Sequence, residues 1–239
     1  MFIRVICPTL LVLIPCAIPA LAEPEKYFKP ALLALFVFLV VVSFLHSYFV
    51  QYKSYIRIKF ENEEIIVESF FQGILHHIKA NTPRFSTKDI NELPYRLNIM
   101  KAKFNISPFK GNNNMFNTCL SIRHHYNMKT DDPDINIILN PGRGVAGKAF
   151  KENKPKIGDT SLMSQAGADD WNLTPEEKEI TRNVKSIISV PIRHVENREK
   201  VLGVFSVDST DSLKDTILGV KDFQELLQKT SKAFHNFVA

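Results

Sequence analysis

The chain has 239 residues, of which 45% are hydrophobic and 23% are charged, and its formal net charge is +5. This composition is too apolar for a disordered chain, and the length fits one or two domains. Three cysteines are too few for a disulfide framework, and two of them, Cys7 and Cys16, lie in an apolar N-terminal run, so structural zinc and paired-thiol redox chemistry are not expected.

Positive charge is concentrated near the N-terminus. Residues 1–60 carry six basic and two acidic side chains, whereas the rest of the chain carries 24 basic and 23 acidic ones. The larger part therefore has no excess of positive charge with which to neutralise phosphates. Nucleic acid is not an expected partner.

Residues 1–22 form a first apolar segment with two interpretations. Arg4 is its single charge, and it ends in Ala20-Leu21-Ala22 before Glu23. A basic start, a short apolar core and an A-x-A ending are typical of a cleavable signal peptide. The run also reaches membrane-spanning length and the next such segment follows only eight residues later, which favours the first arm of a membrane hairpin.

Residues 31–50 are predicted to be a transmembrane helix. They contain no Asp, Glu, Lys or Arg, and a helix of that length is about 30 Å long, the thickness of a bilayer core. Apolar residues surround the helix axis, so no polar face would meet water. Lys53, Arg57 and Lys59 follow. By the positive-inside rule they place the rest of the chain in the cytoplasm, behind an inner or plasma membrane.

Residues 51–82 are predicted to form a connector helix. From Val67 onward, apolar residues recur at the i, i+3, i+4 spacing of one helix face. Residues 56–60 also alternate with the period of a strand, but a continuous helix is favoured. Its apolar face would pack on the soluble domain or on a second copy of the chain, so a homodimer is expected. Pro83 ends the helix.

Residues 83–239 show short strands separated by turns. Thr174-Pro175-Glu176-Glu177 has the pattern of a capping box with proline at the first helical position. The strand patterns predict an α+β fold, with a mixed, mostly antiparallel sheet flanked by helices. Strands are expected at residues 96–104, 116–126, 135–139, 186–193 and 201–208, and a closing helix at 221–237.

Three motifs in this region resemble a GAF domain, the small ligand-sensing module of signalling proteins. They are GRGVAGKAFKENKPKIGD (residues 142–159), VKSIISVPI (184–192) and EKVLGVFSVDS (199–209). In that family a glycine-bearing turn opens a helix beside the pocket, a strand ending in Asp follows, and a hairpin forms the sheet centre. The resemblance covers roughly residues 85–238. It implies a GAF-like fold with a pocket for a small molecule.

Residues 142–147 also match the G-x-G-x-x-G string of dinucleotide sites. Such a site needs a full crossover helix and an acidic residue about 20 positions later. Here the predicted helix stops near Asn153 and no further parallel βαβ unit follows. No cofactor is therefore expected.

The candidate ligand-binding residues combine hydrogen-bond donors with an aromatic ring. Gly144 permits a tight turn, and the helix that follows offers free N–H groups to an anionic ligand. Arg143 would add donors for a phosphate or carboxylate, and Trp171 would stack on a ligand. Alternatively, Arg143 is a solvated loop charge and Trp171 belongs to the core. The complete set is Arg123, Arg143, Gly144, Asp159, Trp171 and Ser186.

The sequence predicts no enzymatic activity. Cyclic-nucleotide-binding relatives carry an Asn-Lys, Phe and Asp-Glu pattern that is missing at residues 207–210, and methionine sulfoxide-reducing relatives need several cysteines where only Cys119 is present. No catalytic or metal-binding arrangement is recognised, and the cluster Asp131, Asp132 and Asp134 is interpreted as a solvated loop.

These features together predict a membrane-anchored, cytoplasmic small-molecule sensor. No catalytic output region follows the GAF-like domain, so the signal would leave through the membrane helices or a partner protein. Two alternatives remain open: a ligand-gated effector that disrupts the membrane, and a dimerising scaffold with a degenerate pocket.

Overall fold

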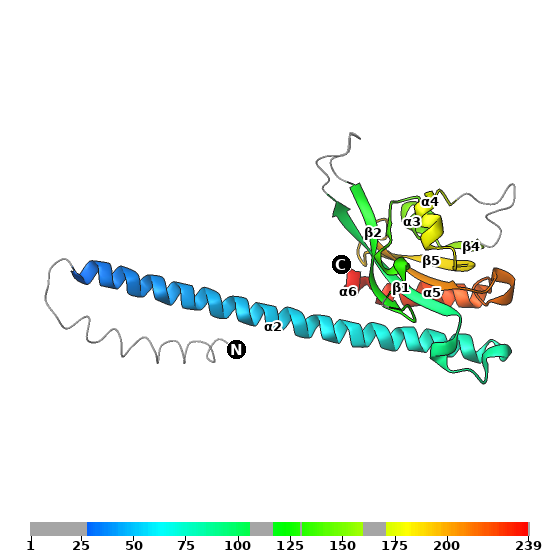
Figure 1. The fold of residues 1–239 in the computed structure, drawn as a ribbon, viewed down its shortest axis with the longest axis horizontal. Coiled ribbons are helices and arrows are strands. Elements are labelled where there is room, and N and C mark those ends of the chain that lie inside the picture. Colours follow the sequence, from blue (N-terminus) through cyan, green and yellow to red (C-terminus); the bar gives the residue numbers. More distant parts are fainter. Residues whose placement is uncertain (1–27, 106–116, 130, 160–170, 239) are drawn as a thin grey trace. The chain divides into compact units, whose positions relative to one another are not determined.

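The computed structural model describes residues 28–105, 117–129, 131–159 and 171–238 (Figure 1). The first apolar segment, residues 1–22, lies outside them, so both interpretations of it stay predictions. The chain divides into two units between Glu63 and Glu64, and each is described by itself.

The described part of the first unit is helical. α2 (Phe28–Ala80) is one uninterrupted helix that includes residues 56–60, so the strand alternative there is wrong. Among the described residues it is the one helix long and apolar enough to cross a membrane, by length and composition. Large apolar side chains such as Phe38, Leu45 and Phe49 are exposed along it, which is compatible with a lipid surround.

The second unit begins at Glu64, before the boundary at residue 83 that the sequence suggests. The cause is the apolar face of α2 from Val67 onward. This face packs against the sheet and the C-terminal helices of the domain, so this part of α2 belongs to the domain core. The buried residues of this face are Val67, Phe71, Ile74, Leu75 and Ile78.

Six strands form one sheet in the order β3-β2-β1-β6-β5-β4, and every neighbouring pair is antiparallel. Short 3-10 helices, η1 (Pro83–Phe85) and η2 (Ile90–Glu92), lead from α2 into the first strand. The strands are β1 (Tyr95–Asn105), β2 (Asn117–Tyr126), β3 (Ile138–Leu139), β4 (Lys156–Asp159), β5 (Ser186–Arg193) and β6 (Val201–Ser209).

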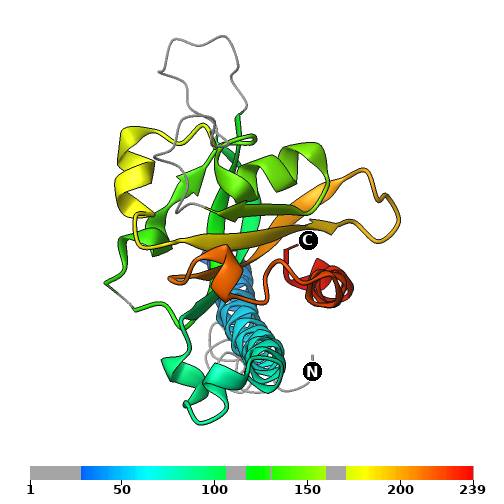
Figure 2. The ribbon, with the colours of Figure 1, turned by 90° about the vertical axis from the view of Figure 1, so that its right-hand side faces the viewer.

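The sheet separates two apolar clusters. On one face lie the domain part of α2, α5 (Lys221–Ala233) and α6 (His235–Val238), which form the larger core with the sheet (Figure 2). On the other face lie α3 (Gly144–Glu152) and α4 (Pro175–Ile180). The predicted capping box of α4 is confirmed, since the Thr174 hydroxyl accepts from the Glu177 N–H at 3.1 Å and the Glu177 carboxylate accepts from the Thr174 N–H at 2.7 Å.

The strand predicted at residues 135–139 is mostly wrong. Its first part belongs to a 3-10 helix, η3 (Pro133–Asn136), and β3 keeps only two residues. The Asp132 carboxylate accepts from the Asp134 N–H at 3.2 Å, and Pro133 follows at the first helical position. An Asx-type cap followed by proline favours a helical turn over an extended strand.

Candidate ligand-binding site

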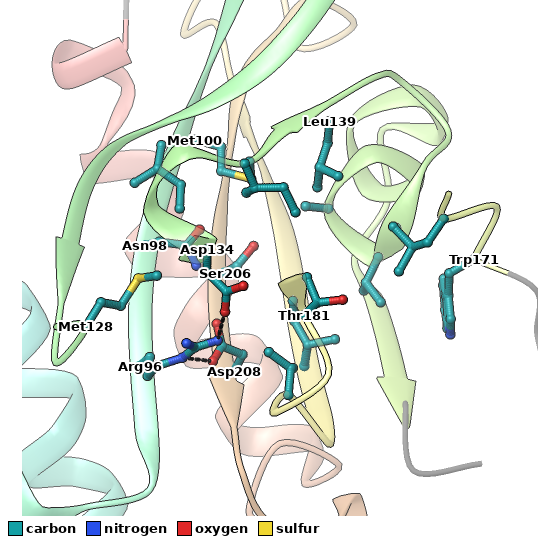
Figure 3. Close-up of a pocket in the computed structure, with 18 residues that line it drawn as sticks. Arg96, Asn98, Met100, Met128, Asp134, Leu139, Trp171, Thr181, Ser206 and Asp208 are labelled. Carbon is teal, nitrogen blue, oxygen red and sulfur yellow. Dashed lines mark hydrogen bonds and ion pairs between the residues drawn. The ribbon is translucent and has the colours of Figure 1, made fainter. Parts of the chain in front are cut away.

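A cavity of about 80 Å³ lies between α3 and the face of the sheet that β1 and β6 form (Figure 3). Most of its described lining is apolar and includes Met100, Leu139, Val145, Trp171 and Leu173. Its polar lining consists of Arg96, Asn98, Asp134, Thr181, Ser206 and Asp208.

The register between β1 and β6 brings the polar residues together. Arg96 lies opposite Asp208, and Asn98 lies opposite Ser206. Because side chains alternate between the two faces of a strand, these four share the cavity face, while Leu97 packs into the larger core on the other face.

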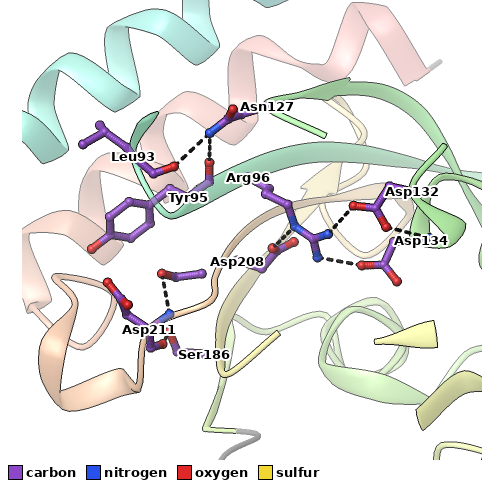
Figure 4. Close-up of polar contacts among 10 residues, drawn as sticks. Leu93, Tyr95, Arg96, Asn127, Asp132, Asp134, Ser186, Asp208 and Asp211 are labelled. Carbon is purple, nitrogen blue, oxygen red and sulfur yellow. Dashed lines mark hydrogen bonds and ion pairs between the residues drawn. The ribbon is translucent and has the colours of Figure 1, made fainter. Parts of the chain in front are cut away.

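Arg96 binds three carboxylates (Figure 4). Its Nε donates to Asp208 Oδ1 at 2.7 Å, its Nη1 to Asp132 Oδ2 at 2.8 Å, and its Nη2 lies 2.7 Å from Asp134 Oδ2. The Arg96 side chain is 12% exposed and that of Asp208 is 5% exposed. The interpretation of the acidic loop as solvated is therefore wrong for Asp132 and Asp134, which hold the guanidinium.

Burial alters the acidity of this cluster. It raises the pKa of the Asp208 carboxyl to about 6, although the Arg96 charge acts in the opposite direction. Burial likewise raises the pKa of Asp134, against the same opposing charge. With all groups ionised, three carboxylates face one guanidinium, and the surplus negative charge lies in a poorly solvated place.

The titration of Asp208 makes stability depend on pH. A carboxyl whose pKa is higher in the folded state stabilises the fold at acidic pH and loses that contribution as the pH rises from about 4 through about 6. We therefore expect the unfolding free energy of wild type, relative to Asp208→Asn, to fall across this range. Chemical denaturation at a series of pH values measures it. Asp131→Asn, an exposed carboxylate of the same loop, is the control, and parallel curves for wild type and Asp208→Asn would contradict the expectation.

Gly144 and Trp171 are the two predicted site residues that line the cavity. Gly144 has a φ of +62°, so the turn does need glycine. Its N–H donates to the Trp171 carbonyl oxygen at 2.6 Å. The Trp171 ring lies beneath Lys148 Nζ, 4.6 Å from the ring centre, and a Cβ at Gly158 would lie 3.1 Å from its Cζ2. Trp171 is thus a packed wall of the cavity, and its carbonyl oxygen occupies one of the helix N–H groups that an anion was expected to use.

The other four predicted residues lie outside the cavity lining. Arg143 precedes α3, and its Nη1 lies 3.6 Å from Glu177 Oε1. Ser186 is buried and donates to a backbone carbonyl in the loop after β6 at 2.7 Å. Asp159 ends β4 opposite Ser186. Arg123 is exposed on β2 and lines a separate cavity with residues of α2.

Sequence reasoning missed Arg96, Asn98 and Asp208, which carry the polar end of the cavity. One signal was available: Arg96 and Asn98 alternate with Tyr95, Leu97 and Ile99, so polar side chains share one face of a strand whose other face is apolar. That pattern indicates that one face of the strand has polar partners, but it does not identify the residues on other elements that provide them.

The sequence matches no protein-family model and no curated protein. Among solved structures, the chain is similar to a GAF domain region from Geobacter sulfurreducens, with 16% identity over 72% of this chain and 96% of that one and a TM-score of 0.40. It is also similar to the GAF domain of nlh2 from A. aeolicus in an inactive state, with 17% identity, 74% and 96% coverage and a TM-score of 0.39.

The antiparallel sheet with helices on both faces confirms the predicted α+β fold class. A type II free methionine-R-sulfoxide reductase from Thermoplasma acidophilum is similar too, with 15% identity, 73% and 94% coverage and a TM-score of 0.43. Because one fold can host many unrelated functions, the function has to be argued from the chain's own residues.

Proposed function

We propose that the chain is a membrane-anchored sensor whose GAF-like domain binds a small molecule in the cavity between α3 and the sheet. The observation that carries the proposal is an apolar cavity with a buried polar end, in a domain whose helix α2 also contains a stretch of membrane-spanning composition. Lys53, Arg57 and Lys59 support a cytoplasmic domain by the positive-inside rule. Output would leave through α2 or through a partner protein.

Binding without catalysis is part of this proposal. Cys119 is buried on β2 and does not line the cavity, and the other two cysteines, Cys7 and Cys16, lie in the N-terminal apolar segment. Among the described residues, neither His nor Cys lines the cavity, and no group of three or more His, Cys, Asp or Glu could hold a metal ion. Within the described lining, thiol reduction and metal-assisted chemistry therefore lack their reacting groups.

Mass spectrometry of small molecules released from the purified full chain tests the sensor proposal. Wild type is expected to carry a small molecule that Leu173→Trp does not, because Leu173 lines the cavity and a larger ring would fill it. Ile138→Trp is the matched control, since Ile138 is exposed and does not line the cavity. A ligand held equally by Leu173→Trp and wild type would place binding elsewhere and contradict the proposal.

We further propose that a second copy of the chain packs on the open face of α2. An open groove of about 490 Å³ runs along this face beside α5, and Ile65, Ile66 and Phe70 expose apolar surface in it. Gly73 also lines the groove, and a Cβ there would meet nothing within 4 Å. Small and apolar side chains on one helix face allow close approach of another helix.

Gly73 offers a test that leaves the domain core intact. Gly73→Gln is expected to weaken self-association, because its side chain would enter the groove, whereas Gly73→Ala should dimerise as wild type does. Light scattering of the full chain in detergent measures the oligomeric state, and melting curves check folding. Dimers of undiminished strength in Gly73→Gln would show that this face is not the interface.

A further inference from the structure

The charges that line the cavity do not balance. Its charged lining in the described residues is Arg96, Asp134 and Asp208, and Asp132 holds Arg96 from the side. If all are ionised the cluster has two negative charges more than positive ones, and if Asp208 is protonated it still has one more. Surplus charge in a buried place is costly unless an opposite charge joins it.

Among the residues that the structure describes, two buried acceptor atoms in the cavity have no hydrogen-bond partner. They are Asp134 Oδ1 and Asn98 Oδ1, and the two residues are 5% and 6% exposed. Arg96 lies against the other oxygen of Asp134. Asn98 comes from β1 and is independent of the acidic loop, and its amide can present oxygen or nitrogen. An ionised carboxylate only accepts, so Asp134 requires a donor.

Three groups that would favour an anion are occupied. The Gly144 N–H at the start of α3 donates to Trp171, and Arg143 lies against Glu177 outside the cavity lining. Arg96, the one basic side chain in the described lining, lies against three carboxylates. An incoming anion would therefore meet net negative charge, and none of these three donors would be available to bind it.

An organic cation fits the rest of the lining better than a metal ion does. A calcium or magnesium ion takes six or more oxygen ligands, whereas the described lining is mostly apolar side chains. Figure 3 shows Arg96, Asn98 and Asp208 on the sheet side of the cavity and Trp171 on the α3 side. A ligand with a charged head and an apolar body would match both sides.

We infer that the cavity binds a small organic ammonium ion, whose N–H groups donate to Asp134 Oδ1 and to Asn98 and whose carbon skeleton lies against Met100, Leu139 and Trp171. This inference rests on the proposed sensor function, because it names the ligand class of the same cavity. The ammonium supplies the missing positive charge and the missing donors together.

Three probes with one carbon skeleton test the charge preference: 3-methylbutylamine, 3-methylbutan-1-ol and 3-methylbutanoate. Each is added to the full chain in detergent, and binding is followed by calorimetry and by the melting temperature. The ammonium is expected to bind and to raise the melting temperature, and the alcohol and the carboxylate are not. Asp134→Asn should weaken ammonium binding about tenfold or more, while Asp131→Asn should bind as wild type does.

Folding of the variant is checked without ligand. Asp134→Asn removes surplus negative charge and keeps an amide oxygen for Arg96, so its melting temperature is expected to equal or exceed that of wild type. The inference would be overturned if Asp134→Asn melted below wild type. It would also be overturned if the ammonium bound equally to wild type and Asp134→Asn, or bound to neither. Tighter binding of the alcohol or the carboxylate, abolished in Leu173→Trp, would overturn the ligand class but support the sensor. Mass spectrometry of the small molecules released from the full chain tests the proposed sensor function separately.

Discussion

Arg96→Met should lower the free energy of unfolding by about 3–5 kcal/mol, because it leaves buried carboxylates without their counter-ion. Arg96 binds Asp132, Asp134 and Asp208 from one guanidinium, and no other basic side chain lines the cavity in the described residues. Chemical denaturation of the full chain in detergent measures the change. Arg182→Met is the control, since the Arg182 side chain is 67% exposed.

The charge explanation has its own test in a double variant. Adding Asp208→Asn to Arg96→Met removes one of the stranded carboxylates, so the double variant should be more stable than Arg96→Met alone. An equal loss in both variants would mean that Arg96 acts through packing. A loss below about 1 kcal/mol for Arg96→Met, the size of a surface ion pair, would contradict the buried cluster altogether.

Phe71→Ala should destabilise the GAF-like domain by about 3–5 kcal/mol. Phe71 lies on α2 and is 1% exposed, with its ring stacked on Phe205 at 5.9 Å and in edge contact with Phe234 at 6.0 Å. Removing it leaves a cavity where α2, β6 and the C-terminal helices meet. His76→Ala, at an exposed position of the same helix that does not line the groove, should change stability by about 0.5 kcal/mol or less.

The comparison of these two variants tests where the domain begins. If α2 were only a linker before residue 83, Phe71→Ala would lower the free energy of unfolding no more than His76→Ala does. A large difference between them would support the assignment of the helix from Glu64 onward to the domain core. Melting of the full chain, followed by near-UV circular dichroism of the domain aromatics, distinguishes the two cases.

The elements of the fold were largely predictable because their signals are local. Polar and apolar residues alternate at the start of β1, whereas β5 and β6 are short and largely apolar runs, and the capping box marks the start of α4. The strand at residues 135–139 failed because Asp132 and Pro133 begin a helical turn, a local signal that outweighs the apolar run after it. The contribution of α2 to the domain core was not predictable, because a helix pattern shows an apolar face without showing what covers it.

The polar end of the cavity was not predictable in the same way. Arg96 and Asp208 are 112 positions apart, and only the pairing of β1 with β6 brings them together. Gly144 and Trp171 were predicted as site residues because a turn favours glycine and a pocket wall favours an aromatic ring. Neither preference depends on the register of the strands. A salt bridge between distant strands depends on register, and a register is not specified by either strand alone.

β1 separates the cavity from α2 by the thickness of a single strand. Arg96 and Asn98 face the cavity, while Leu97 and Ile99, their immediate neighbours, pack in the core cluster that contains Phe71. A shift of the backbone on one side of β1 therefore displaces side chains on the other side directly. A ligand in the cavity and this segment of α2 would both contact side chains of the same part of β1. Coupling between them would therefore not need to pass through distant parts of the sheet.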